Sequence, residues 1–157
     1  MMGRRQERVM DYTTTTTIAA PTRDVFYLLI DIAAWPQWTP TMAAIEPHDR
    51  GPLEVGSTAL VRQPKLRPAV WTIDAIEPGQ RFSWHTSGRG YRIDADHRLT
   101  PTRDETGAEH ATMEVTVTMT GPLRRLMWAF AGRLIRAYVD TESEGLRRHI
   151  ETAREGQ

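Results

Sequence analysis

The stretch LRRLMWAFAGRLIRAYVDTESEGLRRHIETA, residues 123–153, carries the strongest fold signal in this chain of 157 residues. Apolar side chains recur in it at helical spacing, in two stripes that lie about 120° apart around the helix. The first stripe contains Leu123, Met127, Phe130, Leu134 and Tyr138, and the second contains Trp128, Ile135, Val139, Leu146 and Ile150. So wide an apolar sector predicts a long helix that other elements embrace. The first stripe becomes small and polar at Thr141 and Gly145, which predicts looser packing of the second half.

Seven segments before this helix have the composition of β-strands, with glycine- or proline-rich turn signals between them. They cover residues 11–18, 41–47, 57–63, 69–77, 80–86, 91–100 and 109–120. In the last two, apolar and polar residues alternate, so each strand has one covered and one wet face. His97 falls on the covered face of its strand, and Trp71, Ile73 and Ala75 share one side of theirs. The spacing of about ten residues predicts an antiparallel meander that the long helix covers.

Two short helices are expected between the first and second strands. The first opens at Pro21, a residue that suits a first helical turn, and the second covers residues 31–35. The second must end at Trp35, because Pro36 disfavours α geometry in the residue before it. The order is therefore β-α-α-β6-α, an α+β fold. We expect one domain over residues 10–153, a disordered tail at 1–9 and a short C-terminal tail at 154–157.

The composition removes several classes of protein. Twenty basic and twenty acidic residues cancel, so no nucleic-acid partner is indicated, and the absence of cysteine excludes disulfides and thiol nucleophiles. The five histidines have no metal-ligand spacing, and neither a phosphate-binding loop nor a serine-hydrolase elbow is present. We therefore expect no metal and no cofactor. No signal peptide is legible and no apolar run reaches about 20 residues, so we expect a soluble, cytoplasmic protein without an integral membrane segment.

An ordered series of short motifs runs through the chain. They are IAAP (18–21), DIAAWPQWTP (31–40), GPLEVGS (51–57), WTI (71–73) and EPGQRFSW (77–84). Over about residues 10–153 this series resembles the START-like or SRPBCC superfamily, which includes polyketide cyclase/dehydrase-like proteins. The resemblance implies a helix-grip fold, in which a curved seven-stranded antiparallel sheet grips the C-terminal helix around an apolar cavity. It also implies a hydrophobic ligand, such as a lipid or polyketide, and in a subset aromatase/cyclase or dehydratase chemistry.

His97 and Glu142 are the polar residues that the pattern places nearest to such a cavity. His97 is either a core histidine bonded to a backbone carbonyl or to Glu142, a ligand contact, or a general base. Glu142 lies between the two helix stripes. It is either a solvated charge paired locally, or a half-buried carboxylate that needs His97 or Arg62 as its partner. The face of Arg62 stays open, because Leu60 and Val61 beside it are both apolar.

Aromatic residues supply the other candidate ligand contacts. Trp35 and Trp38 flank Pro36, and form either a portal or lid of the cavity or simply part of the core. The candidate ligand-binding residues are Trp38, Trp71, Trp84, Tyr91, His97, Met113, Phe130, Leu134 and Tyr138. For an enzyme, His97 would be the base, with Arg62 or Tyr138 stabilising an enolate.

Three functions follow from these residues. The first is binding or carriage of a hydrophobic or amphipathic small molecule between sheet and helix. The second is an aromatase/cyclase- or dehydratase-type enzyme, and the third is a protein-interaction module with a vestigial cavity and an apolar surface near Trp38 or Trp128. A cavity below about 150 Å³ would remove both of these functions, in which the ligand lies inside the cavity, because ligand pockets typically have volumes of several hundred Å³. A monomer and a homodimer are both compatible with the pattern.

Overall fold

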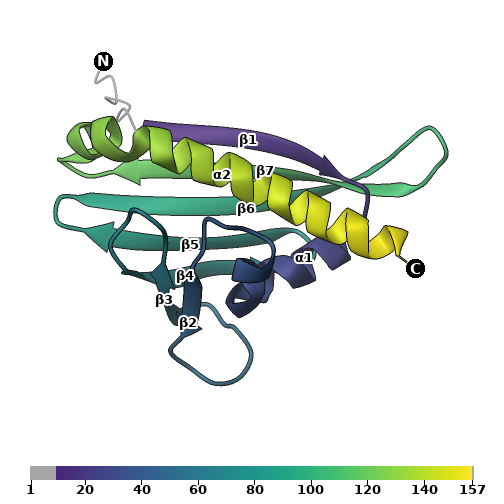
Figure 1. Ribbon diagram of the computed structural model, residues 1–157, viewed down its shortest axis with the longest axis horizontal. Helices are drawn as coiled ribbons and strands as arrows, with labels where there is room; N and C mark the ends of the chain where they lie inside the picture. The colour runs from purple at the N-terminus through teal and green to yellow at the C-terminus, as the bar shows by residue number, and fades with distance from the viewer. Residues whose placement is uncertain (1–9, 157) are drawn as a thin grey trace, which may run out of the picture.

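A single antiparallel sheet of seven strands, in the order β1-β7-β6-β5-β4-β3-β2, forms the body of the protein (Figure 1). The computed structural model describes residues 10–156. The strands are β1 (Met10–Ile18), β2 (Ala44–Pro47), β3 (Thr58–Arg62), β4 (Ala69–Glu77), β5 (Arg81–Gly88), β6 (Tyr91–Arg103) and β7 (Glu109–Thr120). The helices are α1 (Thr22–Ile30), the 3₁₀ helix η1 (Ile32–Gln37) and α2 (Arg124–Glu155). This confirms the expected meander and element order, and α2 runs two residues beyond the expected end.

Strand register fixes which side chains face α2. His97 lies opposite Phe82 on β5 and opposite Val115 on β7, so all three belong to the inner face of the sheet. The alternation expected on β6 and β7 is confirmed. On β4 a register shift between Ile73 and Ala75 turns Ala75 to the outer face and places Ile76 opposite Phe82. The expectation that Ala75 shares a side with Trp71 was therefore wrong, because a β-bulge changes the period of two.

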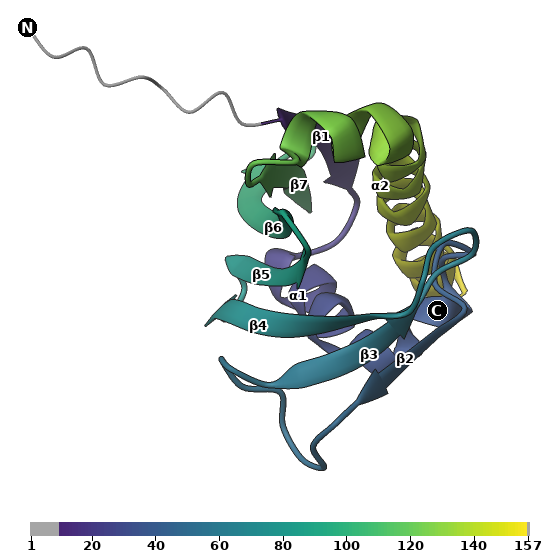
Figure 2. The ribbon, with the colours of Figure 1, turned by 90° about the vertical axis from the view of Figure 1, so that its left-hand side faces the viewer.

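Helix α2 lies along β1 and β7 rather than over the middle of the sheet (Figure 2). The second apolar stripe makes this contact: Trp128, Val139, Leu146 and Ile150 are all buried. The first stripe is only partly covered, and Phe130 is 81% exposed. The first stripe is therefore covered less than its spacing predicts, because the sheet packs mainly against the second stripe.

The second half of α2 packs closely, in contrast to the expected looser packing. A side-chain carbon at Gly145 would lie 2.3 Å from the carbonyl oxygen of Trp38. The small residue at this place permits close contact between α2 and the segment that follows η1.

The 3₁₀ helix η1 includes Pro36, so the expectation that it ends at Trp35 was wrong. The tighter 3₁₀ turn continues without an N–H from proline, and the N–H of Trp38 donates to the Trp35 carbonyl at 3.0 Å. Trp35 itself fills the core, where its Nε1–H donates to the Leu29 carbonyl at 3.1 Å.

Two expectations concern the chain as a whole. The expected tail at residues 1–9 lies outside the described residues. Among the described residues, no helix combines the length and hydrophobicity needed to cross a membrane.

Candidate functional site

A small cavity, with three polar residues in a mainly apolar lining, lies between α1, η1, α2 and the inner face of β6 and β7. Its volume is about 10 Å³, which is room for about one water molecule. It is lined by Leu29, Trp35, Trp38, His97, Met113, Val115, Glu142, Ser143 and Leu146. The enclosed apolar hollow expected beside His97 is not found there, and a cavity below about 150 Å³ cannot hold a whole ligand.

A row of aromatic rings explains why so little space remains. Trp35 contacts Trp38 and Trp84 with ring centroids 5.2 and 5.1 Å apart. Trp71 continues the row, with its centroid 5.0 Å from that of Trp84. Trp35 and Trp38 are therefore core residues. Because Trp38 and Trp128 are both buried, neither forms the exposed apolar surface that a protein-interaction module would need.

His97 is buried on the floor of this cavity. Its Nδ1 lies 3.2 Å from the Phe82 carbonyl oxygen, and since a carbonyl only accepts, Nδ1 carries the proton. Burial lowers the pKa of His97 from 6.5 to about 4. His97 is therefore a neutral imidazole whose Nε2 keeps its lone pair. Its bond to a backbone carbonyl agrees with the first alternative expected from the sequence, a core histidine.

Glu142 lines the same cavity from α2. Its Oε1 accepts a hydrogen bond from Thr41 Oγ1 at 2.8 Å, and Thr41 Oγ1 lies 2.9 Å from Thr39 Oγ1. Burial of the carboxyl group raises its pKa from 4.5 to about 7, although the bond from Thr41 opposes the rise. The hydrogen-bond partner of Glu142 is thus Thr41, and neither His97 nor Arg62. The alternative that Glu142 is a solvated charge with a local partner was wrong.

Two further polar groups at the cavity have no hydrogen-bond partner among the described residues: Nε1 of Trp38 and Oγ of Ser143. Both residues are buried and line the cavity. An indole N–H is a donor only, and a hydroxyl can donate or accept. Together with Glu142, these groups can hold one oxygen atom of a carbonyl or hydroxyl, and the carboxyl can exchange a proton near neutral pH.

Next to this buried end, the inner face stays partly open and apolar. Trp71, Tyr91 and Ile93 are half-buried, although Trp84 and Phe82 beside them are buried. Leu134 and Ile135 of α2 are half-buried as well. We call these five residues the inner apolar surface. Solvent reaches it because α2 lies mainly along β1 and β7 and leaves the inner faces of β4 and β5 less covered.

Three residues expected at the ligand site lie elsewhere. Phe130 points to solvent, because it lies on the side of α2 away from the sheet. Arg62 is exposed on the outer face of β3, 4.0 Å from Glu46, because Val61 takes the inner position. The Tyr138 hydroxyl donates to the Pro64 carbonyl in the β3–β4 loop, and so does not point into the cavity. Of the groups named for catalysis, only His97 reaches the cavity.

A second depression, of about 190 Å³, lies between η1 and the β2–β3 loop. Ile30, Ile32, Leu53, Pro52 and neighbouring residues line it, and its two carboxylates, Asp31 and Asp49, are exposed. The sequence held no signal for it, because its walls come from a helix and a loop that lie on either side of strand β2 in the chain.

On the outer face of the sheet, Asp74, His85 and Asp94 lie close enough to share a metal ion, a cluster that the sequence analysis did not anticipate. His85 Nδ1 is 2.8 Å from Asp74, and Arg92 forms ion pairs with both carboxylates. Arg92 therefore already supplies the positive charge that these two carboxylates need.

The fold and the arrangement of its inner face define a helix-grip protein of the START-like class. The family model described as polyketide cyclase / dehydrase and lipid transport matches residues 10–151, and the chain belongs to this family. No curated protein sequence matches it.

Two solved structures share the fold. The crystal structure of Ara h 8.0201 superposes with a TM-score of 0.69 at 15% identity, over 92% of this chain and 99% of that one. The ZhuI aromatase/cyclase from Streptomyces sp. R1128 gives a TM-score of 0.66 at 16% identity, over 91% and 96% of the two chains. At such identities the likeness concerns the fold alone.

Proposed function

We propose that the protein binds an amphipathic small molecule, whose apolar body lies on the inner apolar surface and whose polar end enters the cavity at Glu142. The observation that carries this proposal is that half-buried Trp71 and Ile93 lie on the same inner face of the sheet as a small cavity with two unpartnered hydrogen-bonding groups. Apolar contact supplies affinity at about 25 cal/mol per Å² buried, and the polar groups orient the ligand.

The size of the cavity restricts how such a ligand binds. About 10 Å³ accommodates one oxygen-sized group and no more. The ligand body must therefore rest on the inner apolar surface, between α2 and β4. The hydrogen bond from Tyr138 to Pro64 spans this side and links α2 to the β3–β4 loop. A ligand that enters from there would meet this bond first.

A binding experiment tests the proposal with oleate as an amphipathic probe. We expect the wild-type protein to bind oleate saturably, and Ile93→Asp to weaken binding at least about tenfold, because a carboxylate replaces an apolar contact. Trp71→Ala should weaken binding similarly without adding a charge. Isothermal titration calorimetry measures the dissociation constants, and circular dichroism checks that each variant is folded.

Val70→Asp is the matched control, since Val70 lies on the outer face of β4 and is exposed. It should leave oleate binding unchanged. Leu53→Asp alters the second depression instead. Loss of binding in Leu53→Asp with retention in Ile93→Asp and Trp71→Ala would overturn the proposed location. Absence of saturable binding by the wild type, together with no compound copurifying in native mass spectrometry, would overturn the function.

A second candidate, a cyclase- or dehydratase-like enzyme, is favoured by one observation: a buried carboxyl with pKa raised to about 7 in the same cavity as a neutral histidine. A group with a pKa near the working pH suits general acid–base catalysis. Glu142, rather than His97, is then the proton-transfer group, because His97 is a weak base.

Mass spectrometry of a copurified compound tests this candidate. Incubation with the wild type in deuterated water should give deuterium uptake or loss of water, and Glu142→Gln should abolish both while still binding the compound. An unchanged rate in Glu142→Gln would exclude this role for Glu142.

A further inference from the structure

The start of α2 exposes apolar side chains on one side. Leu123, Leu126 and Phe130 are 43%, 53% and 81% exposed, and their spacing of three and four residues places them on the same side of the helix. Leu66, in the β3–β4 loop, is 38% exposed. These four are a majority of the seven large apolar side chains exposed among residues 10–156. Such clustering distinguishes this end from a surface with scattered apolar residues.

The same end is strongly basic, although the whole chain is neutral. Residues 63–70, 88–91 and 121–139 hold seven cations and no carboxylate, and the remaining residues hold 13 cations against 20 carboxylates. The seven are Lys65, Arg67, Arg89, Arg124, Arg125, Arg133 and Arg136. Within the described part of the chain, five of them form neither an ion pair nor a cation–π contact: Lys65, Arg67, Arg89, Arg125 and Arg133.

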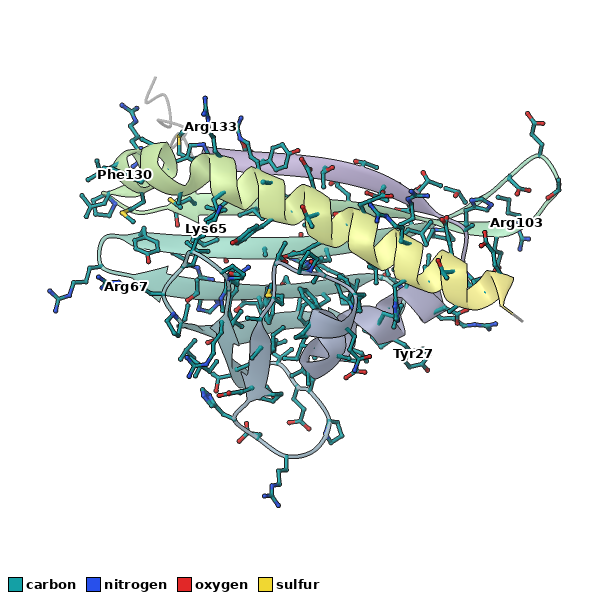
Figure 3. All side chains as sticks on the ribbon, viewed as in Figure 1. Tyr27, Lys65, Arg67, Arg103, Phe130 and Arg133 are labelled. Atoms are coloured by element: carbon teal, nitrogen blue, oxygen red, sulfur yellow. The ribbon has the colours of Figure 1, made fainter. Side chains whose placement is uncertain are left out.

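Backbone and side-chain contacts bring these three segments together. The N–H of Leu123 donates to the Gly90 carbonyl at 2.8 Å, which joins the β5–β6 turn to the start of α2. The Tyr138 hydroxyl joins α2 to the β3–β4 loop at Pro64. Figure 3 shows Phe130, Arg133, Lys65 and Arg67 toward one end of the molecule, with Tyr27 and Arg103 toward the other. We call the exposed apolar residues and cations of this end the basic apolar end.

We propose that the basic apolar end docks on a lipid bilayer that carries anionic headgroups. A helix that shows leucine and phenylalanine to one side, with arginines around them, matches the pattern by which helices lie in a membrane interface. The apolar side chains enter the boundary between headgroups and acyl chains, and the cations pair with anionic headgroups. This surface goes beyond ligand binding, and its test does not depend on oleate.

The charge and the apolar side chains of this end argue against a second copy of the chain and against a nucleic acid. In a symmetric dimer the same patch would face itself, and seven cations would oppose seven. A nucleic acid would satisfy the cations, but would leave Leu126 and Phe130 without apolar contact. A bilayer with anionic headgroups satisfies both features at once.

Flotation with vesicles tests the proposal on the full chain. We expect binding to phosphatidylcholine vesicles that contain about 30 mol% phosphatidylglycerol, and little binding to pure phosphatidylcholine. Phe130→Asp should reduce binding at least about tenfold, and Tyr27→Asp, with the same charge change at an exposed aromatic far from this end, should not. Arg133→Glu should also reduce binding at least about tenfold, and Arg50→Glu in the β2–β3 loop should not.

Each contrary outcome identifies a different surface. Equal binding to both kinds of vesicle, or no binding to either at about 150 mM salt, would overturn the proposal. Loss of binding in Arg133→Glu but not in Phe130→Asp would show a general polyanion surface, and would equally overturn it. Sedimentation that shows a wild-type dimer and a Phe130→Asp monomer would assign this end to a second copy of the chain instead.

Discussion

The free energy of unfolding of the Glu142→Gln variant, minus that of the wild type, should increase by about 3 kcal/mol as the pH rises from about 4 to 7. Replacement of His97 by glutamine should produce the opposite slope over nearly the same range. In the wild type the two effects oppose each other, because both groups line one cavity and burial disfavours the charged form of each.

The sign follows from the two pKa values. The folded protein keeps the Glu142 proton up to about pH 7, but the unfolded chain releases it near pH 4.5, so this group contributes stability that is lost as the pH rises between these values. The folded protein keeps His97 neutral down to about pH 4, but the unfolded chain binds a proton near pH 6.5. That contribution is lost as the pH falls. A tenfold change in proton affinity corresponds to about 1.4 kcal/mol, which gives about 3 kcal/mol for each group.

Urea unfolding across this pH range measures the effect as the free energy of unfolding. Other titrating groups, such as Asp104 with its lowered pKa, act equally in all variants and cancel in the differences. The double variant should regain the wild-type slope. If the single variants give curves parallel to the wild type, the two groups are not buried in the folded protein as described.

Replacement of Gly145 by alanine should destabilise the protein by about 2 kcal/mol, although the same change inside a helix normally stabilises by about 1 kcal/mol. The added carbon would lie 2.3 Å from the Trp38 carbonyl oxygen, and a backbone carbonyl cannot move aside as a flexible side chain can. Helix α2 or the segment after η1 must shift, and the packing around Trp38 is lost.

Ala137→Gly provides the matched control, because Ala137 is exposed on the same helix and reports helix propensity alone. It should cost about 1 kcal/mol in thermal or urea unfolding. If Gly145→Ala proves as stable as the wild type or more so, the close contact between α2 and Trp38 does not exist in solution.

The candidate site was only partly predictable. The position of His97 on the covered face followed from alternation along its own strand, and register confirms it. The bond between Thr41 and Glu142 joins residues 101 positions apart, and neither residue carries a local mark of the other. The outward direction of Arg62 needed the structure too, because its neighbours Leu60 and Val61 gave no contrast in polarity.

The amino-acid sequence by itself determined the order of the strands and helices and the inner faces of β6 and β7. Those properties repeat along a single element every 2 or 3.6 residues and need no distant partner. Only the tertiary structure decided which stripe of α2 is buried, why Phe130 faces solvent and how little space remains beside His97. Such properties depend on how closely remote segments approach one another. A single glycine on α2 and a row of tryptophans from three elements determine that distance here.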